Sequence, residues 1–149
     1  MAQQNGDVIV EDYMTTRMVT INQKNSVLEV AKRMVERNIS SVAITDENDR
    51  IVGILTERDI VKVVTSKVPA EGVTASSLMT RPIVSISKDS PIEDAARNMS
   101  LKKIRHLMVK DPSNQQIIGI ISLTDLARYL KKNMADETIA TSEVWELFF

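Results

Sequence analysis

The chain has 149 residues, of which 43% are hydrophobic and 26% are charged, and its net charge is −1. This is the composition of an ordinary globular protein, and the balanced charge argues against general binding to nucleic acids or anionic membranes. The chain has no cysteine and one histidine, which excludes disulfides and disfavours a histidine-rich metal site. No apolar run reaches membrane-spanning length and the N-terminus lacks a signal-peptide pattern, so a cytoplasmic protein is expected.

An internal repeat organises the chain. The pair Met14-Thr15 recurs as Met79-Thr80, 65 positions later. One extra residue in the turn 111–116 raises the spacing to 66, after which Gly53 pairs with Gly119. Apolar positions match nearly throughout, which indicates a tandem duplication.

The first half of each repeat is predicted to be a short lead-in, a strand and a helix. Val8–Met14 and Val73–Met79 are the predicted helical lead-ins, and Met18–Ile21 is the first short strand. In the second repeat, Ser90 and Pro91 predict the N-cap and the first residue of the helix. In the first repeat, the helix places apolar residues on one face, namely Val27, Val30, Ala31, Met34 and Val35.

The second half of each repeat is predicted to be a strand pair and a helix. The apolar runs Ile39–Ile44 and Ile51–Leu55 flank a polar turn at 46–49, which predicts antiparallel strands. A helix follows through Ile60, Val63 and Val64.

A unit of about 60 residues buries little apolar surface alone, and continuous aliphatic runs are typical of strands covered on both faces. The predicted fold is therefore α/β (α+β), with two tandem β-α-β-β-α units packed sheet to sheet about a pseudo-two-fold axis. The predicted limits are 8–65 for the first unit, 73–131 for the second and 132–149 for a C-terminal extension.

Each repeat closes with a glycine, two aliphatic residues, a hydroxyl residue and an aspartate three places later, in Gly53–Asp59 and Gly119–Asp125. One interpretation is a helix start, in which the hydroxyl and the acid cap the first turn. The other is a ligand site, because an aspartate can accept from both hydroxyls of a ribose while helix N–H groups suit a phosphate. Two copies at equivalent positions favour the binding interpretation.

The duplicated unit resembles the cystathionine-β-synthase (CBS) domain, of which a tandem pair is called a Bateman module. The resemblance covers about Val8 to Leu130 and rests on the Met-Thr lead-in, the Ala and Met of the first helix and the closing Gly-Ile-(Leu/Ile)-(Thr/Ser)-x-x-Asp. It implies a stand-alone CBS-domain protein that binds an adenine nucleotide, AMP first and ADP or ATP next. In such pairs the aspartate segment comes from one unit and the base-contacting strands from the other.

Carried over by position, the resemblance implies two ligand sites. Because the second motif has the complete Ser-x-Thr-Asp form and Arg58 replaces the threonine of the first, the Asp125 site is expected to be the stronger. Site 1 would use Thr56, Arg58, Asp59, Ile83, Val84, Ile104, Arg105 and His106. Site 2 would use Met18, Val19, Ile39, Ser40, Ser122, Thr124 and Asp125.

Arg105 and His106 have two interpretations. They are either a solvated strand end with a partly buried imidazole, or a phosphate clamp, since the resemblance places phosphate-reaching side chains there. Met34 and Met99 lie on the apolar helix face and are predicted core residues, whereas Met14 and Met79 are candidates to flank the cleft.

The C-terminal extension contains the only tryptophan and both phenylalanines of the chain, Trp145, Phe148 and Phe149. Terminal extensions are commonly frayed. The concentration of aromatic residues instead favours docking on a second subunit or on a target.

The predicted function is a regulatory energy sensor whose ligand changes the angle between the units and so acts on a partner that the sequence does not identify. The resemblance also implies a homodimer. The alternatives are a module that binds S-adenosylmethionine or nucleic acid, or a structural oligomerisation unit without a ligand. An enzyme, a cofactor and a metal are not expected, because no acid–base pair, metal cluster or nucleophile–base set is visible.

Overall fold

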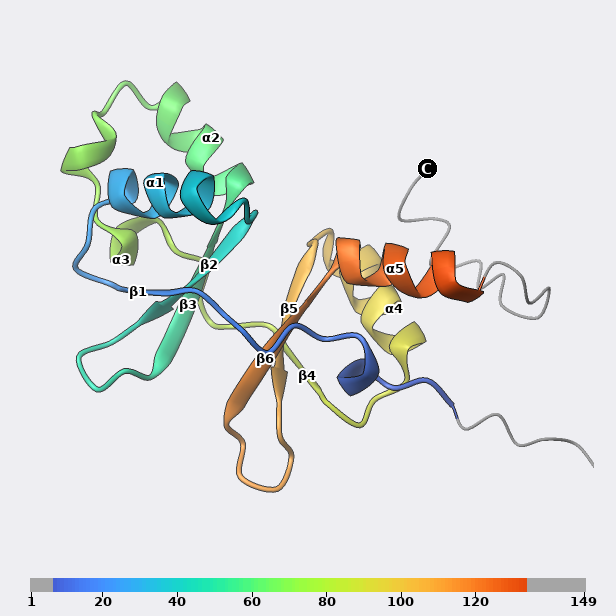
Figure 1. Ribbon diagram of the computed structural model, residues 1–149. Coiled ribbons are helices and arrows are strands. Elements are labelled where there is room, and N and C mark those ends of the chain that lie inside the picture. Colours follow the sequence, from blue (N-terminus) through green and yellow to red (C-terminus); the bar gives the residue numbers. More distant parts are fainter. Residues whose placement is uncertain (1–6, 134–149) are drawn as a thin grey trace, which may run out of the picture. The chain divides into compact units, whose positions relative to one another are not determined.

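The computed structural model describes residues 7–133, which form two compact units (Figure 1). The first compact unit is 18–84, and the second consists of 7–17 together with 85–133. Each contains the predicted β-α-β-β-α order and one three-stranded sheet. No helix within 7–133 is long and apolar enough to cross a membrane.

The first compact unit begins with β1 (Thr20–Asn22), α1 (Val27–Arg37), β2 (Ser41–Thr45), β3 (Ile51–Thr56) and α2 (Glu57–Thr65). A 3-10 turn, η2 (Ala70–Gly72), and α3 (Ala75–Leu78) follow. Strand β1 pairs with β2 in parallel, as the α1 crossover requires, and β2 pairs with β3 antiparallel across a tight turn.

The second compact unit begins with the 3-10 turn η1 (Val10–Asp12) and continues with β4 (Ser85–Ser87), α4 (Ile92–Lys102), β5 (His106–Lys110), β6 (Ile117–Ser122) and α5 (Leu123–Asn133). Its strands pair as in the first unit, parallel for β4–β5 and antiparallel for β5–β6. The equivalent elements start 65 or 66 positions apart, which is the spacing of the sequence repeat.

The core of the first compact unit lies between α1 and the sheet. Val30, Val42, Ile44 and Leu55 are at most 1% exposed and belong to one cluster of buried side chains. The prediction that Met34 and Met99 are core residues is confirmed, since both are buried.

Two details of the helices differ from the predictions. Val35 on α1 and Val64 on α2 are 83% and 78% exposed, because within this unit each lies beyond the part of its helix that faces the sheet. Ser90 is not the N-cap of α4, which begins at Ile92 with Pro91 in the cap position and no side-chain cap. In the first repeat Ser26 fills the position of Pro91, and its side chain accepts a hydrogen bond from the Glu29 N–H.

The lead-in of each repeat packs in the compact unit formed by the other repeat. Thr15 pairs with Ile120 in the second compact unit, and Thr80 pairs with Ile54 in the first. The Ile92 N–H donates to the Val8 carbonyl, as the Val27 N–H does to the Val73 carbonyl. Figure 1 shows the N-terminal segment, in blue, beside β6 and α5. The two sequence repeats therefore exchange their lead-ins symmetrically.

These exchanged lead-ins explain the glycine at the start of each motif. A Cβ on Gly119 would lie 2.8 Å from the Thr15 carbonyl oxygen, and one on Gly53 would lie 2.6 Å from the sulfur of Met79. A side chain at either position would therefore collide with the lead-in. Met79 itself is buried in the core of the first unit.

Candidate functional site

The first motif folds into the junction between β3 and α2. Thr56 ends the strand, and Asp59 lies in the first turn of the helix, where it is only 7% exposed. Asp59 Oδ2 accepts hydrogen bonds from the Thr56 backbone N–H at 2.9 Å and from its hydroxyl at 3.1 Å. These contacts are those of a helix cap, so the capping interpretation is confirmed as one role of the motif.

The other oxygen of Asp59, Oδ1, has fewer interactions. Within the described part of the chain Asp59 Oδ1 accepts no hydrogen bond, and its ion-pair partner is Lys62, whose ammonium lies 3.9 Å away. Buried carboxylate oxygens are normally hydrogen-bonded. Asp59 Oδ1 therefore has lone pairs for a ligand hydroxyl, whereas Oδ2 is committed to the helix start.

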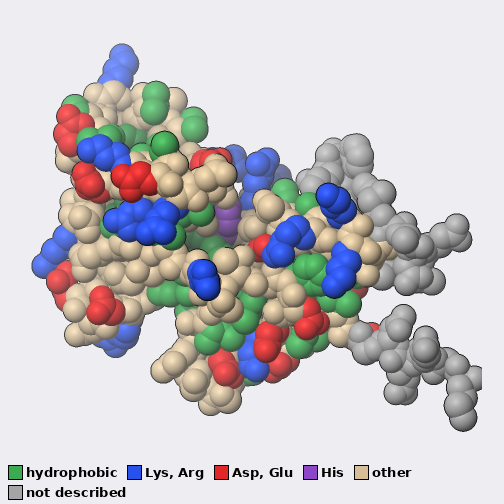
Figure 2. Space-filling model, in the orientation of Figure 1, with side chains coloured by type: hydrophobic (Ala, Val, Ile, Leu, Met, Phe, Trp, Pro, Cys, Tyr) green, Lys and Arg blue, Asp and Glu red, His purple; other side chains and the backbone are tan. Residues whose placement is uncertain are grey.

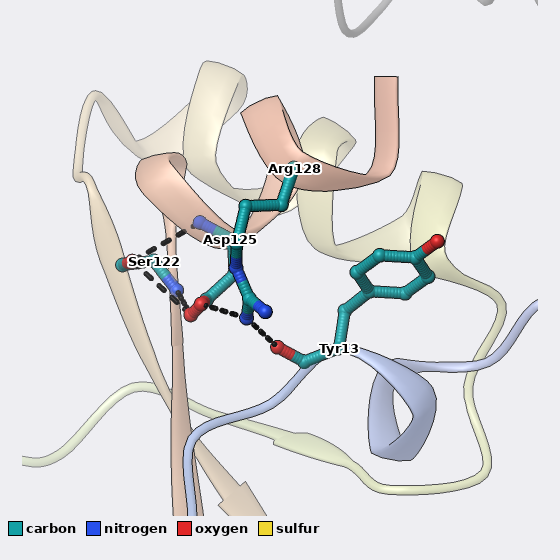
Figure 3. Close-up of polar contacts among 4 residues, drawn as sticks. All are labelled: Tyr13, Ser122, Asp125 and Arg128. Atoms are coloured by element: carbon teal, nitrogen blue, oxygen red, sulfur yellow. Dashed lines mark hydrogen bonds and ion pairs between the residues drawn. The ribbon is translucent and has the colours of Figure 1, made fainter. Parts of the chain in front are cut away.

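The second motif has the same capping hydrogen bonds, and its aspartate also binds Arg128 (Figure 3). Asp125 is 5% exposed, and its Oδ2 accepts from the Ser122 N–H at 2.8 Å and from the Ser122 hydroxyl at 3.1 Å. Its Oδ1 accepts from Arg128 Nη2 at 2.6 Å. The same Nη2 donates to the Tyr13 carbonyl oxygen at 3.0 Å. Both oxygens of Asp125 are thus engaged.

Arg128 was missed by the sequence analysis. Its only signal is a position three residues after an aspartate on a helix, which is a common surface pairing. The contact with the Tyr13 carbonyl could not be foreseen, because it depends on the exchange of the lead-ins. The Tyr13 ring also packs edge-on against Tyr129, with ring centroids 5.4 Å apart.

Each compact unit brings its own strand start beside its own motif. Ser41 lies opposite Thr56 in the β2–β3 pair, and the Glu57 N–H donates to the Ser40 carbonyl at 3.0 Å. In the second unit His106 lies opposite Ser122, and the Leu123 N–H donates to the Arg105 carbonyl at 2.9 Å. Arg105 and His106 are therefore neighbours of the Ser122–Asp125 motif.

The remaining predicted site residues fall into two groups. Arg58, Ser40, Arg105 and Thr124 are exposed, while His106 and the aliphatic candidates are half-buried: Met18, Val19, Ile39, Ile83, Val84 and Ile104. Each predicted site takes members from both compact units, so sites 1 and 2 as complete sets stay predictions. The C-terminal extension with its aromatic residues lies outside the described residues, apart from Lys132 and Asn133 at the end of α5.

The chain has nearly equal numbers of basic and acidic residues, with a net charge of −1. On the face drawn in Figure 2 basic and acidic side chains are interspersed and do not form a patch of one sign. Among residues 7–133, no group of three or more histidines or acids could hold a metal ion.

The family model of the CBS domain matches the chain twice, at residues 10–66 and 75–132. The chain is 35% identical over 124 residues to an uncharacterized 17.7 kDa protein of Acidianus ambivalens, which covers 81% of this chain and 72% of that protein. It is 30% identical over 118 residues to the CBS domain-containing protein YhcV of Bacillus subtilis, covering 79% and 82%. A homoserine O-acetyltransferase of Methanococcoides burtonii is 35% identical over 121 residues, or 81% of this chain, but the chain spans only 24% of that enzyme.

Solved structures agree with this match. A conserved CBS domain protein from Thermoplasma acidophilum has a TM-score of 0.83 at 25% identity, covering 95% of this chain and 75% of that one. A CBS domain pair in complex with 5′-methylthioadenosine and S-adenosyl-L-methionine has a TM-score of 0.76 at 28% identity, covering 85% and 98%. A CBS domain protein from Pyrobaculum aerophilum complexed with AMP shares the fold, with a TM-score of 0.74 at 20% identity and coverage of 95% and 98%. Since the family model matches both repeats and most of the chain, the chain belongs to the CBS domain family, as a tandem pair.

Proposed function

We propose that the chain is a regulatory module that binds an adenine nucleotide and has no chemistry of its own. AMP is the favoured ligand, with ADP or ATP next. The observation that carries the proposal is the buried Asp59 carboxylate, which keeps Oδ1 without a hydrogen bond among the described residues while Oδ2 is fixed by Thr56. An anionic acceptor held in place in this way suits a ribose hydroxyl.

Phosphate is the expected partner of the basic side chains near the motifs. Arg58 lies in the first turn of α2, two residues after Thr56. Arg105 directly precedes β5, which pairs with the strand that ends at Ser122. Both arginines are exposed cations. A guanidinium matches the geometry of a phosphate with two parallel hydrogen bonds. The proposal therefore includes the residue sets of sites 1 and 2 as the sequence predicts them. In site 1 the phosphate would be bound by Arg58, Arg105 and His106 together.

One specific observation supports a second candidate ligand. The solved CBS pair at 28% identity holds 5′-methylthioadenosine and S-adenosyl-L-methionine, which share the adenosyl group with AMP. The exposed arginines favour an anionic phosphate over the cationic sulfonium of S-adenosylmethionine, so AMP stays first. The net charge of −1 and the mixed charge on the face drawn in Figure 2 give no support to nucleic acid as the ligand.

The test is the effect of AMP on thermal stability. At about 100 times its dissociation constant, AMP should stabilise the fold by about 2.7 kcal/mol per independent site. For a chain of this size that is a rise of roughly 5–11 °C in Tm. Asp59→Ala and Asp125→Ala should each remove part of the rise, and the double variant should remove all of it.

A cap without a ligand role provides the matched control. Ser26→Ala removes the N-cap of α1, which is no member of either proposed site, and should lower the Tm of the ligand-free protein while leaving the rise with AMP intact. If AMP produces no rise in the unsubstituted chain, or if the full rise survives in the double variant, the proposed site is wrong. By this proposal the ligand acts through a conformational change on a partner protein or on the geometry of a homodimer.

A further inference from the structure

The two motifs differ in the residue that faces the aspartate from one helical turn further along. In the second motif Arg128 Nη2 donates to Asp125 Oδ1 at 2.6 Å, a charge-assisted hydrogen bond. The Asp125 side chain is 7% exposed, while that of Arg128 is 58% exposed. Figure 3 shows the guanidinium extending from α5 to the carboxylate and to the Tyr13 carbonyl.

In the first motif the equivalent position, 66 residues earlier, is Lys62. Its ammonium lies 3.9 Å from Asp59 Oδ1, which is beyond hydrogen-bond distance, and its side chain is 66% exposed. A lysine has a flexible point charge, whereas an arginine holds a carboxylate with a rigid planar fork. The first aspartate is therefore left open and the second is closed by its own helix.

We infer that Arg128 is a specificity-determining residue that makes the two motifs unequal, with Asp59 as the high-affinity ribose acceptor and Asp125 as a low-affinity one. This inference rests on the proposed function. Asp125 Oδ1 can accept from both hydroxyls of a ribose only when Arg128 leaves it, because Oδ1 already accepts one hydrogen bond from Arg128 and Oδ2 accepts two from Ser122. The order of affinities is the reverse of the one expected from the complete Ser-x-Thr-Asp form.

Displacement of Arg128 also changes the lead-in. The same Nη2 that binds Asp125 donates to the Tyr13 carbonyl at 3.0 Å. A ligand that moves the guanidinium away from Asp125 therefore also removes this hydrogen-bond donor from the Tyr13 carbonyl. Occupation of the second motif is thereby coupled to the segment around Tyr13, which packs on Tyr129 and precedes the Thr15–Ile120 bridge. Occupation of the first motif has no such contact to break, because no hydrogen bond of Lys62 to Asp59 is present in the described residues.

The experiment is a calorimetric titration of the full chain with AMP. The unsubstituted chain should show one tight and one weak site. Arg128→Gln should strengthen the weak site by about tenfold to a hundredfold, the range of one charge-assisted hydrogen bond. Lys62→Arg is the mirror variant and should weaken the tight site, while Arg128→Lys should give the behaviour of the first motif. Hydrogen exchange at Thr15 and Ile120 should rise on filling the weak site and also in ligand-free Arg128→Gln.

The outcomes separate this inference from the proposed function. If AMP binds the unsubstituted chain and Arg128→Gln leaves both affinities unchanged, Arg128 has no effect on binding. If the substitution weakens one affinity, Arg128 is a phosphate ligand. Either result overturns the inference and leaves the proposed function standing. If the substituted chain does not fold, Lys62→Arg alone decides, since no loss at the tight site would overturn the inference. If neither the unsubstituted chain nor any variant binds AMP, the proposed function and the inference are both wrong.

Discussion

At the scale of the residue, the motif glycines are set by the exchanged lead-ins and not by backbone conformation, since no described glycine has a positive φ. The two glycines differ in what a methyl group would meet. At Gly119 it would meet the Thr15 backbone carbonyl at 2.8 Å, whereas at Gly53 it would meet the flexible side chain of Met79. A methionine can change rotamer, but a backbone carbonyl moves only with its segment.

Gly119→Ala should therefore destabilise the protein by about 1–3 kcal/mol, the usual range for an overpacked interior, and Gly53→Ala by less. Gly72→Ala is the matched control, because a Cβ there would meet no atom within 4 Å, and its effect should stay within about 0.5 kcal/mol. Urea unfolding of the three variants measures the differences. Equal losses for Gly119→Ala and Gly72→Ala would contradict the close approach of Thr15.

Tyr129 gives the fold a dependence on alkaline pH. Burial, reinforced by the nearby Glu93 carboxylate, raises the pKa of the Tyr129 phenol from 10.0 to about 12. The phenol also donates to Glu93 Oε1 at 3.3 Å, which joins α5 to α4. An acid whose pKa is higher in the folded state than in the unfolded state stabilises the fold fully below about pH 10, and this contribution is lost as the pH rises towards 12.

The loss should amount to roughly 2 kcal/mol between pH 10 and pH 12, because each pKa unit corresponds to about 1.36 kcal/mol and part of the two-unit effect falls outside this interval. Tyr129→Phe removes the phenol, so the stability difference between the unsubstituted chain and the variant should shrink from pH 10 to pH 12. Taking the difference cancels other alkaline effects that the two proteins share, such as that of Lys88, whose pKa is raised by Glu11. A constant difference across the interval would show that the phenol does not titrate with unfolding.

At the scale of the element, the exchange of lead-ins makes residues 7–17 part of the second compact unit. Val10 in η1 is completely buried there, and the Val10 N–H donates to the Ser90 carbonyl at 2.9 Å. The Glu11 N–H donates to the Lys88 carbonyl at 3.0 Å. Complete burial of a valine contributes about 1.5–3 kcal/mol.

Val10→Ala should therefore lower the local stability of the second compact unit and leave the first nearly unchanged. Native-state hydrogen exchange should show faster exchange in β5 and β6, with β2 and β3 little affected. Val61→Ala, at a valine that is 62% exposed on α2, is the control and should change neither. Faster hydrogen exchange confined to β2 and β3 would indicate that the lead-in packs on its own repeat, which would contradict the structure.

The elements themselves could be predicted from the sequence, but their partners could not. The spacing of apolar residues located both strand pairs and the helices, and duplication supplied an independent check at 65 and 66 residues. A lead-in of three or four helical residues carries no periodicity that names the surface it covers. In a duplicated chain, either copy offers a complementary apolar surface. Helix periodicity likewise placed Val35 and Val64 on the apolar face, although neither is covered within its compact unit.

The same limit applies to the candidate site. The local motif predicts contacts over three residues, so Thr56 with Asp59 and Ser122 with Asp125 could be foreseen. The Arg128–Asp125 pair has the spacing of many surface ion pairs that contribute little, and nothing in the sequence separates it from them. Its importance follows from the burial of the aspartate and from the Tyr13 carbonyl, which are properties of the packed unit.

At the scale of the whole molecule, exposed apolar side chains favour association. The first compact unit exposes large apolar side chains on its two longer helices, Val35 at 83%, Val61 at 62% and Val64 at 78%. Removing such side chains from water stabilises an assembly in proportion to the apolar area that becomes buried. The sequence adds Trp145, Phe148 and Phe149 near the C-terminus, and aromatic residues are enriched at protein interfaces.

Deleting residues 134–149 should therefore shift the chain towards a smaller assembly while leaving its AMP affinity intact. This deletion keeps the described extent of α5, Leu123–Asn133, and so retains Asp125 and Arg128. Sedimentation over a range of concentrations measures the assembly, and calorimetry with AMP measures the site. Replacing the three aromatic residues by alanine in the full-length chain is the matched variant, because it removes the apolar side chains and keeps the chain length. If both altered chains sediment as the unsubstituted protein does, the aromatic residues have no part in self-association. If AMP affinity falls with the deletion instead, the extension belongs to the ligand site.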